Sequence, residues 1–285
     1  MSDFITNFLW TYQTVLSQVA INSLLALSMY CVLATGQLFL GQVGFMAIGA
    51  YCSAVLTTML GMPLWVSMPA GALLALLVAL LLVQPMLRLS GVYMAIGTIA
   101  FGEVIRSLAI NFDVLGGALG ISGIPQSLPQ TALYAMVIVV AAILVCAMHS
   151  RLGRAVEAVR TDELAAQAMG VDVRRIKLIS VLASAALAGL AGAAGAHSMG
   201  TVTPNDFSFV SSVAILSFVV LGGVASPLGA ILGAVLLTLL PELLSSFSEF
   251  RTMINGLAIV LVVLLLPSGL FPLKIIRIRG NAKRR

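Results

Sequence analysis

Few side chains in this 285-residue sequence could carry out catalysis, since it has only ten acidic residues, two histidines and three cysteines. The most suggestive pattern is the sequence GISG at residues 120–123, which presents Ser122 between glycines as intramembrane serine proteases present their nucleophile. His149 or His197 would have to act as the general base. We do not favour this chemistry, because Ser122 lies in a Gly- and Pro-rich segment and not at the start of an apolar helix.

Other motifs that bind metals or nucleotides are missing from the sequence. It contains no HExxH, no CxxC and no glycine-rich phosphate-binding loop. Cys31, Cys52 and Cys146 lie in apolar segments without metal-ligand spacing, so we interpret them as packing residues. We therefore expect no catalytic residue, no metal site and no cofactor in this chain. Any use of ATP would require a separate ATPase subunit.

Polar side chains inside apolar segments are the next candidates for chemistry, because burying them in lipid is costly. Gln37 and Gln42 are expected to face the interior of a helix bundle, either to hydrogen-bond between helices or to line a wet path for a solute. Glu103 and Arg106 are three residues apart and share one helix face. They form either a structural ion pair or part of an outer vestibule, and too few ionisable residues accompany them for a proton relay.

The composition determines which scaffold must position these residues. Hydrophobic residues make up 60% of the sequence, charged residues 9%, and the mean hydropathy is +1.12. Soluble domains carry roughly 25% charged residues, and a soluble fold could not cover this much apolar surface. A soluble enzyme, a nucleic-acid-binding domain and a disordered chain are therefore excluded. We predict an all-α polytopic membrane bundle, with residues 1–285 as a single domain.

Apolar runs predict about nine membrane spans, within a range of eight to ten, because one span takes roughly 20 residues. They are expected at residues 14–34, 36–60, 64–84, 91–111, 131–149, 178–199, 208–224, 228–245 and 252–271. Residues 150–177 are too hydrophilic to span and form the longest polar loop. Residues 112–130 form the longest loop of the opposite side, and their Gly and Pro content indicates a segment that is ordered by packing or by a partner, or else mobile.

The positive charges are gathered in two blocks. No Lys or Arg precedes Arg88, and twelve of the fifteen lie within residues 150–177 and 272–285. Cytoplasmic loops of membrane proteins are enriched in Lys and Arg, and nine spans place both blocks on the cytoplasmic side. We therefore expect a periplasmic N-terminus and a basic cytoplasmic tail over 272–285, which can also contact anionic lipid.

The polar loop contains one short predicted helix, residues 161–170. Thr161 is the expected N-cap, and Gly170 is expected to end the helix in a left-handed conformation. Asp162 and Glu163 fall in the first turn, where the helix dipole favours carboxylates. The apolar positions share one face at helical spacing: Leu164, Ala165, Ala168 and Met169. The helix either packs on its own membrane domain or docks into a groove of a cytoplasmic partner.

The same loop resembles a known family. Residues 164–170 are similar to the EAA-x3-G coupling loop of ATP-binding cassette (ABC) importer permeases, with Leu164 where Glu is usual. Over residues 154–172, the sequence RAVEAVRTDELAAQAMGVD resembles the corresponding loop of branched-chain amino acid permeases of the LivM type. In that family this loop engages the ATPase subunit. The resemblance therefore implies a coupling loop over residues 150–177.

Three further segments resemble the same family. They read GQLFLGQVGFMAIGAY at residues 36–51, LSGVYMAIGTIAFGEVIR at 89–106 and LGGVASPLGAILGA at 221–234. Their glycines are typical of helices that approach one another closely, and Gly229 and Gly233 form a small-xxx-small face. Gly189, Gly192 and Gly195 predict a slender packing helix in the sixth span. The order and spacing of these matches cover most of residues 36–245.

The resemblance implies an ABC importer permease fold and function. It assigns ATPase coupling to Glu157, Arg160, Asp162, Glu163, Ala165, Ala166, Met169 and Gly170. Candidates for the translocation path are Gln37, Gln42, Tyr93 and Glu103. Candidates for contact with a binding protein are Arg106, Asp206 and Arg251.

The implied partners are a second, LivH-like permease, two ATPases that bind ATP and Mg, an extracytoplasmic solute-binding protein and membrane lipid, but no nucleic acid. The implied location is the inner membrane of a bacterial cell. Branched-chain or other hydrophobic amino acids are the expected substrates; urea and amides stay open, as does pairing with an identical or a related permease. The alternative function is a secondary transporter or channel, which would leave the 157–172 segment unexplained.

Overall fold

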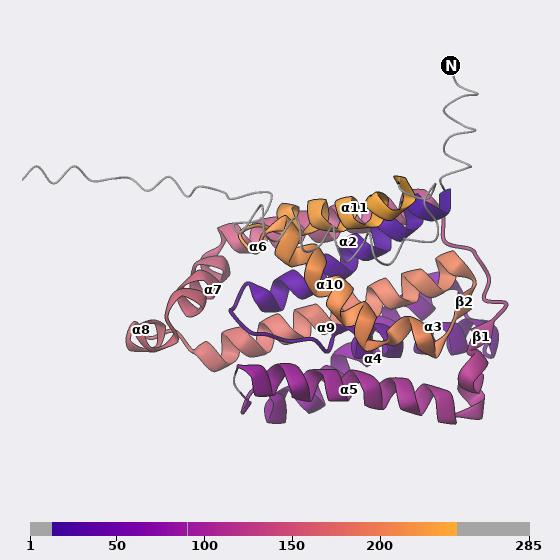
Figure 1. Ribbon diagram of the computed structural model, residues 1–285, viewed down its shortest axis with the longest axis horizontal. Helices are drawn as coiled ribbons and strands as arrows, with labels where there is room; N and C mark the ends of the chain where they lie inside the picture. The colour runs from indigo at the N-terminus through magenta and orange to yellow at the C-terminus, as the bar shows by residue number, and fades with distance from the viewer. Residues whose placement is uncertain (1–12, 90, 244–285) are drawn as a thin grey trace, which may run out of the picture.

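The computed structural model describes residues 13–89 and 91–243, which form a bundle of helices with a short two-stranded ribbon at one end (Figure 1). The α-helices are α2 (Gln13–Leu33), α3 (Gln42–Thr58), α4 (Leu64–Met86), α5 (Val92–Asn111), α6 (Gln130–His149), α7 (Arg151–Thr161), α8 (Glu163–Ala168), α9 (Val173–Met199), α10 (Phe209–Gly222) and α11 (Pro227–Leu243). The shorter elements are the 3₁₀-helices η1 (Asp113–Leu115), η2 (Gly117–Leu119) and η3 (Pro204–Phe207) and the strands β1 (Ile121–Ser122) and β2 (Thr201–Val202).

The described helices agree with the predicted helical membrane class. Five of them, α2, α4, α5, α6 and α9, are long and apolar enough to cross a membrane. The pair α10 and α11 is bent by 120° and counts together as a sixth candidate, and α3 is a shorter apolar helix of 17 residues. The predicted span at 252–271 lies outside the described residues. The count of nine therefore stays a prediction.

The second predicted span begins later than expected. Gly36 has φ = +76°, and residues 37–40 are not helical. The backbone amide of Leu40 instead donates a hydrogen bond to Thr98 Oγ1 on α5, at 3.0 Å. The prediction of a helix from residue 36 was wrong, because a left-handed glycine ends the regular path of the chain. α3 starts at Gln42.

Small residues hold the centre of the bundle together. α9 packs against α2, α3 and α4. A Cβ atom at Gly49 of α3 would collide with the backbone of Gly189 in α9, and one at Gly192 would collide with the backbone of Met46 in α3. This confirms that glycines here permit close helix approach, as small residues do in membrane bundles. Gly195 differs, since its Cβ would meet only Ile21, at an ordinary 3.9 Å.

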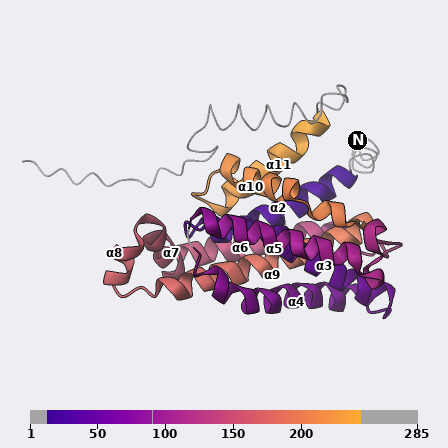
Figure 2. The same cartoon turned by 60° about the horizontal axis from the view of Figure 1, so that its bottom comes forward.

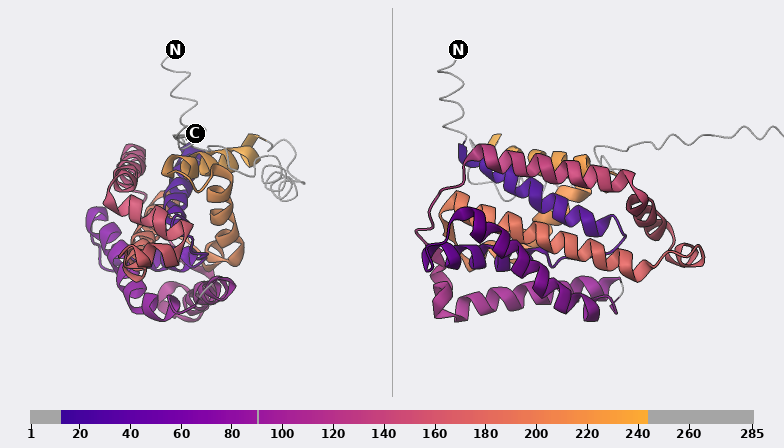
Figure 3. Two further views of the ribbon diagram at one scale, coloured as in Figure 1. Left: turned by 90° about the vertical axis from the view of Figure 1, so that its left-hand side faces the viewer. Right: turned by 180° about the vertical axis from the view of Figure 1, so that it is seen from behind.

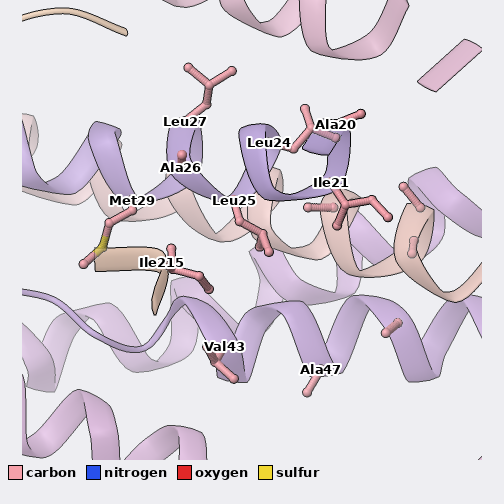
Figure 4. Packing of buried hydrophobic residues seen from close by; sticks show 14 of the residues in the cluster. Ala20, Ile21, Leu24, Leu25, Ala26, Leu27, Met29, Val43, Ala47 and Ile215 are labelled. Atoms are coloured by element: carbon pink, nitrogen blue, oxygen red, sulfur yellow. The ribbon is translucent and has the colours of Figure 1, made fainter. Parts of the chain in front are cut away.

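The apolar core lies on both sides of α2. Figure 4 shows leucines and alanines of α2 beside Val43 and Ala47 of α3 and Ile215 of α10. These residues are almost fully buried. Because lipid is as apolar as leucine, this core is held by close packing more than by exclusion of water.

The bend between α10 and α11 is a glycine contact. A Cβ at Gly229 would come within 2.5 Å of the carbonyl oxygen of Gly222, and one at Gly233 would collide with the carbonyl oxygen of Phe218. Ser226 Oγ accepts a hydrogen bond from the Gly229 amide at 3.1 Å and caps the second helix. The predicted small-residue face at Gly229 and Gly233 is confirmed as the contact between two successive helices.

The 112–130 segment is ordered by packing at the end of the bundle. Ile121 pairs with Val202 and Ser122 with Thr201 in an antiparallel ribbon, and the amide of Ile124 donates to the carbonyl of Gly200 at 3.0 Å. Ser122 is thus part of a strand.

The two histidines are engaged elsewhere. His197 is fully buried, with Nε2 2.9 Å from Ser53 Oγ and Nδ1 3.3 Å from the Pro125 carbonyl oxygen. His149 Nδ1 lies 2.8 Å from the carbonyl oxygen of Val145. No hydrogen bond between described residues joins either ring to Ser122, so the geometry of a serine protease is not assembled.

The first block of basic residues collects at the end opposite the ribbon. Three of its six residues lie on α7 and three at the start of α9, beside α8 (Figures 2 and 3). This one-sided distribution agrees with the predicted cytoplasmic loop. The basic tail lies outside the described residues, and the sides on which the termini emerge stay predictions.

The packing predicts that Gly49→Ala is destabilising. The new methyl group would meet the Gly189 backbone, which cannot rotate away, so α3 and α9 must separate; overpacking of this kind costs roughly 1–3 kcal/mol. Thermal unfolding of the detergent-purified protein would show a lowered midpoint. Gly195→Ala is the control, because its methyl group fits, and equal midpoints for the two variants would contradict the packing argument.

Candidate functional site

The polar loop forms an elbow of two helices, α7 and α8, that projects from the end of the bundle (Figure 1). Asp162 sits between them. Its Oδ1 accepts hydrogen bonds from the amides of Leu164 and Ala165, at 2.9 and 3.0 Å, so Asp162 is the N-cap of α8. The prediction of Thr161 as N-cap was wrong, because Thr161 still belongs to α7 and donates its hydroxyl to the Glu157 carbonyl at 2.9 Å.

α8 is fixed to the bundle through one small residue and one ion pair. Ala166 is 3% exposed and packs in a cluster with Val159 of α7 and Val173 of α9. Lys177 Nζ lies 2.6 Å from Glu163 Oε1 and ties the start of α8 to α9. A helix of six residues has little stability of its own in water. These contacts therefore hold α8 in a defined orientation.

The opposite face of α8 is apolar and exposed. Leu164 is 78% exposed and Met169 84%, and Ala165 and Ala168 are exposed beside them. These four residues, which we call the apolar face of α8, are the ones whose spacing predicted a common face. No described part of the chain covers them. The elbow can thus insert an apolar edge into a groove of another protein.

Gly170 ends the elbow as predicted. Its φ is +82°, and a Cβ there would meet nothing within 4 Å. Space is therefore available at residue 170, but L-residues with a side chain adopt this backbone conformation at a cost. The glycine turns the chain from α8 into α9.

A cavity of about 670 Å³ lies behind the elbow, between α2, α6, α7 and the α10–α11 bend. We call it the inner cavity. Glu157 and Arg160 of α7 line it together with Tyr30 of α2. Arg160 Nη1 also donates a hydrogen bond to the carbonyl oxygen of Val224, in the bend, at 3.3 Å. Arg160 of the elbow thus contacts the bend between α10 and α11.

A second cavity, of about 380 Å³, lies at the other end of the bundle, between α2, α3, α9 and α10. We call it the outer cavity. Asp206 and Asn205 of η3 line it together with Gln18 and Asn22 of α2. Most of its remaining wall is apolar. It combines a carboxylate, amides and apolar side chains within the volume range of small-molecule sites.

The predicted path residues do not gather in one place. Gln37 and Gln42 are buried in the bundle, as expected for polar residues in a membrane domain, and Gln37 Nε2 donates to Thr35 Oγ1 at 2.7 Å. Neither glutamine lines the inner or the outer cavity. Tyr93 lies on the exposed surface of α5. Their role in transport stays a prediction.

Glu103 and Arg106 connect α5 to the start of α10. Arg106 Nη1 lies 3.1 Å from Glu103 Oε2, and Arg106 Nη2 donates to Asn205 Oδ1 at 3.2 Å. Glu103 Oε1 accepts a hydrogen bond from the amide of Phe209 at 3.2 Å. The pair therefore positions η3 and α10, which is more than the intrahelical ion pair that its spacing predicts.

Of the predicted docking residues, two lie at the ribbon end. Arg106 is engaged as described, and Asp206 Oδ2 accepts hydrogen bonds from the amide and hydroxyl of Thr203, at 3.0 and 2.9 Å. This capping box shapes η3. Arg251 lies outside the described residues. Among the described residues, no group of three or more His, Cys, Asp and Glu side chains could hold a metal ion.

The sequence matches the family model described as "Branched-chain amino acid transport system / permease component" over residues 11–266. It is 37% identical to the high-affinity branched-chain amino acid transport system permease protein LivM of Escherichia coli (strain K12) over 274 residues, which cover 84% of this chain and 64% of that protein. LivM of Salmonella typhimurium is 35% identical with the same coverage.

The permease protein LivH of the same Escherichia coli system is 24% identical over 124 residues, which cover 43% of this chain and 40% of LivH. The chain spans about 64% of the length of its LivM relatives. No solved structure matches it.

The capping geometry predicts that Asp162→Ala loosens α8 without unfolding the bundle. Loss of an N-cap costs about 1 kcal/mol, so the amides of Leu164 and Ala165 should exchange with solvent about fivefold faster. Hydrogen exchange with mass spectrometry measures this. Asp172→Ala is the matched control, because Asp172 caps α9 through the amide of Arg175 at 3.1 Å. Equal effects of both variants on the α8 peptide would contradict the local role of Asp162.

Proposed function

Because the chain belongs to the family of branched-chain amino acid transport system permeases, we propose that it is the membrane-spanning subunit of an ABC importer. In this proposal it forms the translocation path together with a second permease subunit. ATP and Mg are bound by separate ATPase subunits, and the chain itself is not an enzyme.

The elbow carries this proposal. An apolar face on a short polar loop is costly in water and is explained by a protein groove that receives it. The apolar face of α8 provides the anchors, and Ala166 and Gly170 hold its backbone in position. Asp162 and Glu163 place charge at the start of α8, while Glu157 and Arg160 line the inner cavity behind it. The protein that provides this groove is proposed to be the ATPase subunit.

The elbow is also placed to transmit motion. Arg160 contacts Val224 in the α10–α11 bend, and the inner cavity leaves room beside this contact. A displacement of α8 by the ATPase would shift α7 and, through Arg160, the bend. Packed helices move by such small shears between discrete arrangements. The proposed result is that the path opens alternately to the two sides of the membrane.

The opposite end is the proposed landing site for an extracytoplasmic binding protein. Arg106 and Asp206 lie there with η3 and the ribbon, and Arg251 is expected near them. In this orientation the elbow faces the cytoplasm, the N-terminus is periplasmic and the basic C-terminal tail is cytoplasmic. We place the chain in the inner membrane of a bacterial cell.

The proposed substrates are branched-chain and other hydrophobic amino acids. The relatives LivM and LivH, which are permease proteins of a high-affinity branched-chain amino acid transport system, support this class. The described helices carry few charged groups, so tight selection of the substrate is expected to reside in the binding protein.

Purification of the tagged chain from its native host in mild detergent tests the proposal. We expect a second permease-like chain and ATPases with phosphate-binding loops to copurify, as identified by mass spectrometry. A folded chain that purifies alone, under conditions that keep a known ABC importer intact, would contradict the importer assignment.

Leu164→Asp should release the ATPase. Burial of a carboxylate in an apolar groove costs about 2 kcal/mol or more, so ATPase recovery in the same purification should fall strongly. Leu119→Asp is the matched control, since Leu119 is 89% exposed at the other end of the bundle. Full recovery of the ATPase with Leu164→Asp would exclude α8 as the docking helix.

Gly170→Val should impair transport while the protein stays in the membrane. A β-branched residue at φ = +82° is strained by roughly 1–2 kcal/mol or more, which displaces the end of α8. Gly170→Asn is the control, because Asn tolerates the left-handed conformation and should retain most of the uptake. Ala166→Asp, which buries a carboxylate against Val159 and Val173, should act like Gly170→Val. Normal uptake by both damaging variants would count against the elbow.

A further inference from the structure

The outer cavity has the chemistry of an α-amino acid site. We propose that it binds an amino acid with an apolar side chain inside the permease, after release from the binding protein. This inference rests on the proposed import function and adds a location and a binding mode. In this proposal the permease itself contacts the substrate and contributes to its selection.

The apolar wall would receive the side chain of the amino acid. Ile21 and Leu25 of α2, Met46 of α3 and Phe218 of α10 line the cavity. Gly192, Gly195 and Ala196 of α9 also line it, and these small residues leave the space open. A volume of about 380 Å³ suits a small ligand.

Two oxygen acceptors would receive the ammonium group. Gln18 Oε1 is buried and has no hydrogen-bond partner among the described residues. The orientation of this amide is set by Gln18 Nε2, which donates to Asn22 Oδ1 at 3.4 Å, and Asn22 in turn donates to Thr238 Oγ1 at 2.9 Å. A buried acceptor without a donor is costly, and a ligand N–H group would remove that cost.

Asp206 supplies the second acceptor and the negative charge. Its Oδ2 is occupied by Thr203, whereas no hydrogen bond between described residues uses its Oδ1. The capping box therefore fixes the carboxylate and leaves one oxygen for a cation. An ammonium group is bound well by a carboxylate combined with an amide oxygen.

The carboxylate of the amino acid would meet donors on the same rim. Asn205 Oδ1 accepts from Arg106 Nη2, which directs the amide oxygen toward Arg106 and leaves Nδ2 as the donor. Ser211 also lines the cavity with a hydroxyl group. Donors, acceptors and an apolar wall thus occur together, as a zwitterion with a hydrophobic side chain requires.

Import measured with three substrates tests the apolar wall. The full complex in proteoliposomes is compared as wild type, Gly195→Leu and Ala142→Leu, using leucine, valine and alanine. The Cβ of residue 195 meets only Ile21, itself a lining residue, so a leucine there narrows the cavity. We expect leucine import to fall about tenfold or more and alanine import to fall less.

Ala142→Leu is the matched control, because Ala142 is exposed on α6 and lines neither cavity. It should import all three amino acids as wild type does. Stimulation of ATP hydrolysis by the binding protein shows that each complex is intact. If Gly195→Leu leaves leucine import unchanged, or lowers leucine and alanine import equally, the cavity site is overturned. A wild-type complex that imports no amino acid contradicts the proposed function itself, which is distinguishable because no substitution is involved.

Asp206→Asn tests the charged rim. Asn retains the capping oxygen but removes the charge, so leucine and alanine import should fall by the same factor, about tenfold. Because Asp206 also lies in the proposed landing site, stimulation of ATP hydrolysis by the binding protein decides between the two roles, and the cavity role predicts that this stimulation persists. If that stimulation is lost instead, Asp206 acts in docking, and its assignment to the cavity is overturned.

A diazirine analogue of leucine provides a readout apart from transport rate. Irradiation during turnover should label peptides of α2, α3, α9 or α10, with competition by excess leucine and loss of label in Gly195→Leu. Labels confined to other helices of this chain, while the analogue is imported, would overturn the site.

Discussion

Close approach of α9 to its neighbours is the constraint on which the rest of this bundle depends. Gly49, Gly189 and Gly192 place backbone against backbone, where any side chain would intervene. In a membrane, such contacts replace the hydrophobic effect as the source of helix association. They also set the positions of α2 and α3, which both line the outer cavity, and α2 lines the inner cavity as well.

The elbow depends on the same helix. Its two supports, the Val173 packing contact and the Lys177 ion pair, both come from the first two turns of α9. α9 therefore gives α8 a fixed base, while the apolar face of α8 stays exposed, as the proposed docking to an ATPase requires. Arg160 makes a separate connection, to the α10–α11 bend. In the proposed mechanism, different residues thus support α8 and transmit its motion.

Sequence patterns predicted the elements whose signals are local. Long apolar runs located α2, α4, α6 and α9, and Gly170 correctly ended α8. The start of α3 was placed wrongly, because the apolar run continues through the left-handed Gly36. The N-cap of α8 was placed one residue early, because Thr161 and Asp162 are both good caps and only the end of α7 decides between them.

Contacts between distant segments could not be read from the sequence. Nothing local associates Gln18 with Asp206, or Arg160 with Val224, because these residues are brought together by helix packing alone. Glu103 and Arg106 were recognised as a pair, but their contacts with Asn205 and Phe209 depend on where η3 lies. The class of the protein follows from composition; its cavities follow from the three-dimensional fold.

The two cavities have an electrical consequence. Along α2, Leu25 lines the outer cavity and Tyr30 the inner one, so the two lining residues are five positions apart, or about 7.5 Å of helix rise. The hydrocarbon core of a bilayer is about 30 Å thick. Where both cavities are open to water, the membrane voltage falls over a shorter distance beside α2 than through the surrounding bilayer. Any charge carried between the two cavities would move within that steeper field.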